Sequence, residues 1–162
     1  MRLPVLCLPL LLLALPSCAQ EGPVRLSPEQ IGQIFCIARQ GNDEAPIRAL
    51  LSPSVAADVA RAEARSAALG ERFPDEKPPL GDGLPWQSFP DVPATCTVTG
   101  ATTESKAADG EFVLVYGFPD APDAGWTDRI VLVDIDGRLR ISDIVYEDGS
   151  TLGQFLLKAS QP

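Results

Sequence analysis

Apolar residues in the first half of the chain recur every three or four positions, which is the spacing of a helix with one buried face. The run Ser27–Gln30 supplies a cap, a proline in the first turn and a capping-box glutamine, so a helix is predicted from there to Gln40, with Gly41 as its stop. The pattern then predicts a short helix around Glu44–Leu51 and a longer amphipathic helix over Ser54–Leu69. We therefore expect the first half to be helical.

The first of these helices carries more apolar side chains than one stripe needs. The apolar stripe consists of Ile31, Ile34, Phe35 and Ala38. Two further apolar residues, Cys36 and Ile37, flank it on either side. We predict that this helix is buried on most of its circumference.

After Cys96 the apolar spacing changes to every second residue, and β-branched and aromatic side chains become common, which is typical of strands. Two Asp-Gly dipeptides, Asp109-Gly110 and Asp136-Gly137, are typical of tight hairpin turns. We therefore expect an antiparallel four-stranded meander, with strands over Thr97–Glu104, Phe112–Phe118, Thr127–Ile135 and Leu139–Tyr146.

A two-residue turn at positions 136–137 fixes the register of the last hairpin. One face should then carry Ile130, Leu132, Asp134, Leu139 and Ile141. Ile144 and Tyr146 rejoin this face only if one extra residue intrudes near Ser142-Asp143, which predicts a β-bulge and a curved sheet.

Between the two halves, positions 70–93 are rich in proline and glycine and show no sustained period, which indicates a long loop. Trp86 and Phe89 within it are expected to pack back onto the core, because two large exposed aromatics would favour aggregation.

The segment Ile141–Leu152 reads ISDIVYEDGSTL, a strand followed by a Tyr-x-Asp-Gly-Ser turn, and precedes a short terminal helix or strand extension over Thr151–Lys158. With the order of helices first and meander second, it resembles exported bacterial domains of the NTF2-like (cystatin-like cone) superfamily, in particular the DUF3828 type. The resemblance covers roughly Pro28–Lys158. It implies an α+β fold whose helices and strongly bent sheet enclose a pocket, and it brings no catalytic residues.

The first 19 residues have the features of a secretory signal peptide: Arg2 precedes an apolar run that is shorter than the about 20 residues of a membrane span. Ser17-Cys18-Ala19 permits cleavage before Gln20, whereas positions 15–18 resemble a lipobox with an atypical Pro16. Two products stay open, a soluble periplasmic or secreted protein and a lipoprotein anchored through Cys18. Positions 20–27 are then a polar spacer, and 28–160 form a single domain.

Composition excludes several classes of function. The chain has 22 acidic and 13 basic residues and a net charge of −9, opposite in sign to a protein that binds nucleic-acid backbones. It contains no histidine, which excludes a histidine base, a catalytic triad with histidine and a histidine-ligated metal. We expect no cofactor.

Two cysteines, Cys36 and Cys96, remain after the signal peptide, and in an exported protein two such cysteines usually pair. A disulfide is therefore predicted. Buried free thiols and a redox site are the alternatives, and the absence of a Cys-x-x-Cys spacing disfavours the redox site.

Asp134 and Tyr116 are the candidates for acid–base chemistry. Asp134 shares a strand face with Ile130 and Leu132, where loss of solvent would raise its pKa, and Tyr116 could donate to an oxyanion. Asp120, Asp123 and Asp128 could offer oxygens to Ca²⁺, but their spacing matches no calcium loop, so a solvated acidic loop is the simpler reading.

Three classes of function remain. We favour a non-enzymatic envelope domain that binds a small apolar ligand or a protein partner, with a second subunit as cover for the outer sheet face around Val113 and Val115. The alternatives are a small isomerase or hydro-lyase of the cone type, and a toxin-neutralising or envelope-assembly partner whose acidic charge would suit a basic surface.

Overall fold

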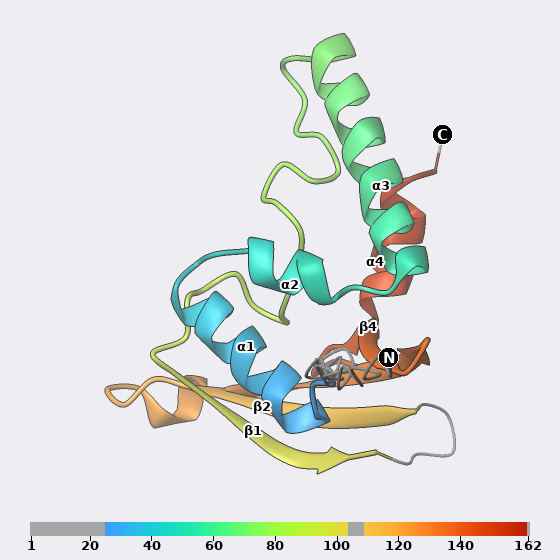
Figure 1. Cartoon of the computed structure of the whole chain (residues 1–162). Helices are drawn as coiled ribbons and strands as arrows, with labels where there is room; N and C mark the ends of the chain where they lie inside the picture. The colour runs from blue at the N-terminus through green and yellow to red at the C-terminus, as the bar shows by residue number, and fades with distance from the viewer. Residues whose placement is uncertain (1–24, 104–108, 162) are drawn as a thin grey trace, which may run out of the picture.

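The computed structural model describes residues 25–103 and 109–161. Three helices precede one antiparallel sheet in the sequence, and a fourth helix follows it (Figure 1). The strands lie in the order β1-β2-β3-β4, so the predicted α+β meander is confirmed. The elements are α1 (Pro28–Gln40), α2 (Ala45–Leu50), α3 (Pro53–Arg72), β1 (Thr95–Thr102), β2 (Gly110–Gly117), the short 3₁₀ turn η1 (Pro122–Ala124), β3 (Trp126–Ile135), β4 (Arg138–Val145) and α4 (Leu152–Ala159).

Helix α1 begins with the predicted capping box and lies across β1 and β2 (Figure 1). Ser27 N donates to Gln30 Oε1 at 2.8 Å, and Gln30 N donates to Ser27 Oγ at 3.2 Å. Gly32 permits the close approach to the sheet, because a Cβ there would lie 2.8 Å from Val98 methyl carbons. The cap was predicted from the sequence, whereas the contact at Gly32 was not.

The expected burial of α1 on most of its circumference is confirmed, because seven of its thirteen residues are buried and the exposed ones lie in one stripe. The expectation fails at Ile37, which is 71% exposed, whereas Arg39 is buried. The packed face follows Gly32, Phe35 and Arg39, because the contact with the sheet at Gly32 fixes how the helix is rotated.

The last hairpin has the predicted register. Asp136 and Gly137 both have positive φ, and Leu132 pairs with Ile141 while Val131 pairs with Asp143. Ser142 is thus the extra residue of a bulge, and its hydroxyl donates to Val131 O at 3.1 Å. The predicted bulge is confirmed.

The expected tight turn at Asp109-Gly110 is wrong. Gly110 is the first residue of β2 and pairs with Leu132, so the β1–β2 connection spans positions 103–109. A Cβ at Gly110 would lie 3.0 Å from Thr102 O. The glycine therefore serves the close approach of two strands, not a turn.

The core lies between the inner sheet face and the helices. Phe112, Leu114 and Ile130 are fully buried there, as are Phe35 of α1 and Leu152 of α4. The C-terminal segment is a helix, capped by Thr151, and α3 stands beside it (Figure 1). The outer sheet face points away from α1, and Val115 on it is 39% exposed.

Cys36 and Cys96 form a disulfide, as predicted, with their Sγ atoms 1.98 Å apart. The bond joins α1 to β1 across the division between the helical and stranded halves. Within residues 25–103 and 109–161, no helix is long and apolar enough to span a membrane. The predicted signal peptide and Cys18 lie outside the described residues, as does most of the predicted spacer.

Candidate functional site

The loop after α3 returns past α2 and the end of α1 towards the sheet (Figure 1). Its last part, residues 84–91, contacts the start of β3 and the residues after β4, and we call this segment the strap. Trp86 and Gln87 of the strap are 1% and 4% exposed. The prediction that Trp86 packs onto the core is confirmed. Phe89 stays 46% exposed, although its ring meets Trp126 edge-on at 5.2 Å. Pro85 and Pro90 keep the strap out of helix and sheet, so side chains must hold it in place.

Gln87 holds the strap from within. Its side-chain amide nitrogen donates to Phe89 O at 2.7 Å and to Asp91 O at 2.6 Å, which closes a turn. Its side-chain oxygen accepts from Arg39 Nε at 2.8 Å. The end of α1 is thereby joined to the strap through buried groups.

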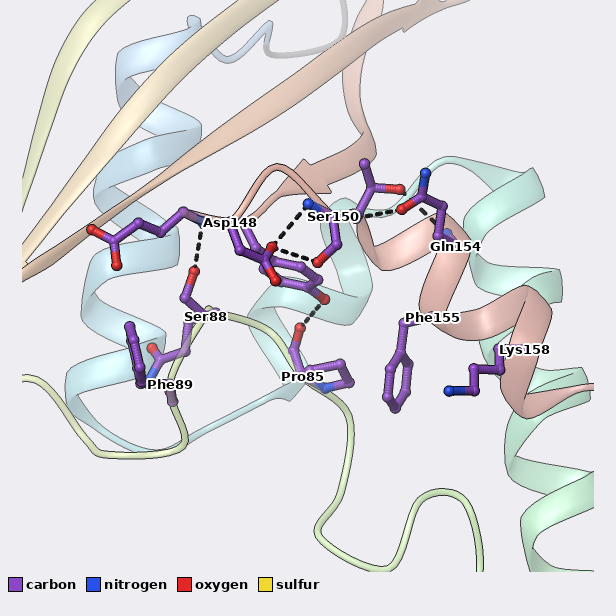
Figure 2. Close-up of a pocket in the computed structure, with 12 residues that line it drawn as sticks. Pro85, Ser88, Phe89, Asp148, Ser150, Gln154, Phe155 and Lys158 are labelled. Carbon is purple, nitrogen blue, oxygen red and sulfur yellow. Dashed lines mark hydrogen bonds between the residues drawn. The ribbon is translucent and has the colours of Figure 1, made fainter.

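Ser88 binds the strap to the sheet. Its backbone N donates to Asp128 Oδ2 at 3.0 Å, and its hydroxyl donates to Asp128 Oδ1. The same hydroxyl accepts from Glu147 N at 2.9 Å, and Tyr146 Oη donates to Pro85 O at 2.6 Å (Figure 2). The strap is therefore fixed to α1, β3 and the end of β4.

Asp128 is buried, with 2% of its surface exposed. Burial raises the pKa of its carboxyl, while the hydrogen bonds from Ser88 act in the opposite direction. Tyr116 stacks on Trp126 with ring centroids 5.0 Å apart. Its hydroxyl has no hydrogen-bond partner, and burial raises its pKa well above the ordinary value.

One side of the strap borders a groove of about 550 Å³, which we call the α4 groove. Figure 2 shows Phe155 of α4 lying between Pro85 and Lys158. Asp148 at the groove's edge accepts from Ser150 N at 2.9 Å and from Ser150 Oγ at 2.6 Å, and these bonds lower the pKa of its carboxyl. The groove thus has apolar walls and charged ends.

The other side of the strap borders a second hollow of about 360 Å³, the Arg39 pocket. Trp86 and Leu84 contribute apolar surface to it, and Arg39 lines it from the end of α1. The two hollows share five lining residues, Pro85, Gln87, Ser88, Phe89 and Phe155. The strap is therefore their common wall.

The acid–base candidates Asp134 and Tyr116 are not brought together. Asp134 is exposed at the β3–β4 turn, where its Oδ1 accepts from Gly137 N at 2.6 Å, so it is a solvated turn carboxylate and not a desolvated base. Tyr116 pairs with Trp126 at the other end of β3. Eight residues of strand separate Trp126 from Asp134, or about 26 Å.

The three acidic residues considered for Ca²⁺ are also divided. Asp120 and Asp123 are exposed, but Asp128 faces the core and binds Ser88, which corrects its assignment to a solvated loop. In the part of the chain that the structure describes, no three Cys, Asp or Glu side chains are grouped as metal ligands.

Sequence reasoning missed the residues that build this site: Arg39, Gln87 and Ser88. For Asp128 a signal was present, because it lies two residues before Ile130 and so belongs to the buried face of its strand. For Arg39 the signal was its position four residues after Phe35. No local signal marked Gln87 or Ser88.

Comparison with protein-family models, with curated proteins and with solved structures found no match to this chain.

Proposed function

We propose that the chain is an exported, non-enzymatic binding domain of the NTF2-like type, which holds a small apolar ligand against the strap in the α4 groove. The observation that carries the proposal is the groove itself, about 550 Å³ in volume and lined by Pro85, Phe89 and Phe155. Pockets for small ligands have volumes of roughly 300–1,000 Å³ and mostly apolar walls with a few polar groups.

The way the groove is built supports the same proposal. Its strap wall is held by Tyr146 and Ser88, and the turn at its edge is held by Asp148 and Ser150. Walls fixed before binding lower the ordering cost of association. The Cys36–Cys96 disulfide supports export, because disulfides persist in oxidising compartments.

Binding of the uncharged dye N-phenyl-1-naphthylamine, followed by its fluorescence, tests the proposal. Replacing Phe155 with alanine removes an apolar wall and should weaken binding about tenfold, the effect of losing roughly 1.4 kcal/mol of apolar contact. Leu157→Ala is the matched control, because Leu157 lies on the same helix but is 67% exposed and does not line the groove.

Two results would contradict the proposal: failure of the wild-type protein to bind the dye, or equal weakening by both substitutions. Native mass spectrometry of protein taken directly from the periplasm provides an independent measurement. A retained small molecule supports ligand binding, whereas a retained protein supports a partner-binding role instead.

A further inference from the structure

Arg39 carries a buried charge without a counter-ion. The residue is 6% exposed, and among the described residues no carboxylate lies within ion-pair distance of its guanidinium. Its one hydrogen bond is the 2.8 Å contact from Nε to Gln87 Oε1, a neutral acceptor. A guanidinium has five N–H donors, and the Nη atoms of Arg39, which bond no described residue, are not fully buried and can meet a ligand.

The acids on the wall of the Arg39 pocket do not neutralise this charge. Glu44 is paired with Arg48, whose Nη2 lies 2.9 Å from Glu44 Oε2. Asp82 is paired with Lys77. Arg48 also pairs with Glu63, so Glu44 still acts on Arg39 from a distance, but no acid on the pocket wall makes a salt bridge to the Arg39 guanidinium.

A buried charge of this kind is unfavourable unless something compensates it. Burial lowers the pKa of Arg39 and the nearby Glu44 carboxylate acts in the opposite direction, and arginine stays protonated at neutral pH. The carbonyl end of α1 offers a partial negative charge. It does not supply hydrogen-bond acceptors for the N–H groups at the forked end of the guanidinium. A planar carboxylate matches that fork with two parallel hydrogen bonds.

We propose that the Arg39 pocket binds the carboxylate of a small apolar carboxylic acid, with the guanidinium of Arg39 as its anchor. The ligand's apolar body lies against the strap residues that the pocket shares with the α4 groove. Trp86 and Leu84 supply further apolar surface in the pocket. This inference rests on the proposed function, because it names the class of ligand that the strap would hold.

The chain's net charge of −9 repels anions at long range, so the attraction must come from Arg39 itself in a site shielded from water. The expected ligand therefore carries one carboxylate and a compact apolar body. A polyanion is excluded by the same reasoning, because the pocket offers one unpaired cation.

Isothermal titration of the disulfide-bonded mature protein with 2-naphthoate and with 2-naphthamide tests the proposal. The two compounds share one shape and differ in charge. The wild-type protein should bind the carboxylate at least tenfold more tightly than the amide, as expected for a charge-assisted bidentate contact. Raising the salt concentration should reduce this preference only slightly, because the pair is buried.

Arg39→Met should abolish the preference and leave the affinity for the amide unchanged. Arg39→Lys keeps the charge without the fork and should retain part of the preference, which provides a folded variant if the methionine protein does not fold. Lys158→Met tests the competing cationic anchor, because Lys158 lines the α4 groove but not the Arg39 pocket. Arg61→Met is the matched control, because Arg61 is an exposed arginine of α3 that lines neither hollow.

The failures of the two proposals are distinguishable. If neither compound binds the wild-type protein, the proposed function fails and the inference fails with it. If both bind equally, the binding function stands and the role of Arg39 is refuted. Loss of the preference in Lys158→Met, with Arg39→Lys unchanged, would also refute it.

Discussion

Asp128 is the residue through which the strap is joined to the sheet, and its replacement is the sharpest test of how the site is built. Asp128→Ala removes the acceptor of two hydrogen bonds, from Ser88 N at 3.0 Å and from the Ser88 hydroxyl. Hydrogen bonds to a charged group contribute about 1.5–3 kcal/mol each, but the substitution also removes a carboxylate that is costly to bury. We expect a net loss of about 1–2 kcal/mol in the free energy of unfolding.

Asp128→Asn keeps the shape of the side chain and removes its charge, so the pH dependence of the variant's stability shows the effect of the charge alone. Burial raises the pKa of Asp128 above its ordinary 3.8, so the folded protein binds this proton more tightly than the unfolded chain does. The stability that protonation supplies is complete below pH 3.8 and is lost as the pH rises through the raised pKa. The asparagine variant should therefore gain stability relative to the wild type as the pH rises from about 4 towards neutrality.

Urea unfolding followed by circular dichroism measures both effects, and tryptophan fluorescence reports on the strap. The chain has two tryptophans, and both adjoin the strap: Trp86 belongs to it, and Trp126 contacts Phe89. Asp128→Ala should shift their emission to longer wavelength as the strap loosens. Thr127→Ala, an exposed neighbour on β3, is the control and should leave the emission unchanged. A wild type that gains stability over Asp128→Asn with rising pH would refute the reasoning.

Two further predictions concern the disulfide and the predicted signal peptide. Replacing Cys36 and Cys96 together with serine should lower the free energy of unfolding by about 4 kcal/mol, from the entropy of a loop closed across 60 positions, and an unchanged guanidinium midpoint would contradict this. Mass spectrometry of the mature protein should find a start at unmodified Gln20 or at a lipidated Cys18, and a retained Met1 would refute export.

Elements governed by neighbouring residues were predictable from the sequence. The cap at Ser27 and the turn at Asp136-Gly137 depend on a few consecutive positions, and the bulge at Ser142 follows from strand alternation. Where tertiary contacts decide, the same reasoning failed. Gly110 has the sequence of a turn, but the approach of Thr102 O decides its place.

The site depends on tertiary contacts throughout, which explains why the sequence did not indicate it. The bonds that fix the strap join residues 48, 40 and 61 positions apart, from Arg39 to Gln87, from Ser88 to Asp128 and from Tyr146 to Pro85. Arg39 is a charged residue in the last turn of a helix, and such residues are ordinarily exposed to solvent. Only the return of the strap over α1 buries it.

The titration behaviour of these buried groups favours binding over proton transfer. A general base works best with a pKa near the operating pH, and the chain has no histidine to supply one. Burial moves the pKa of Tyr116 further above neutrality. Burial raises the pKa of the Asp128 carboxyl towards neutrality, but both of its oxygens accept hydrogen bonds from Ser88. Catalysis by Asp128 would require the strap to open first, whereas Arg39 can receive a carboxylate with the strap in place.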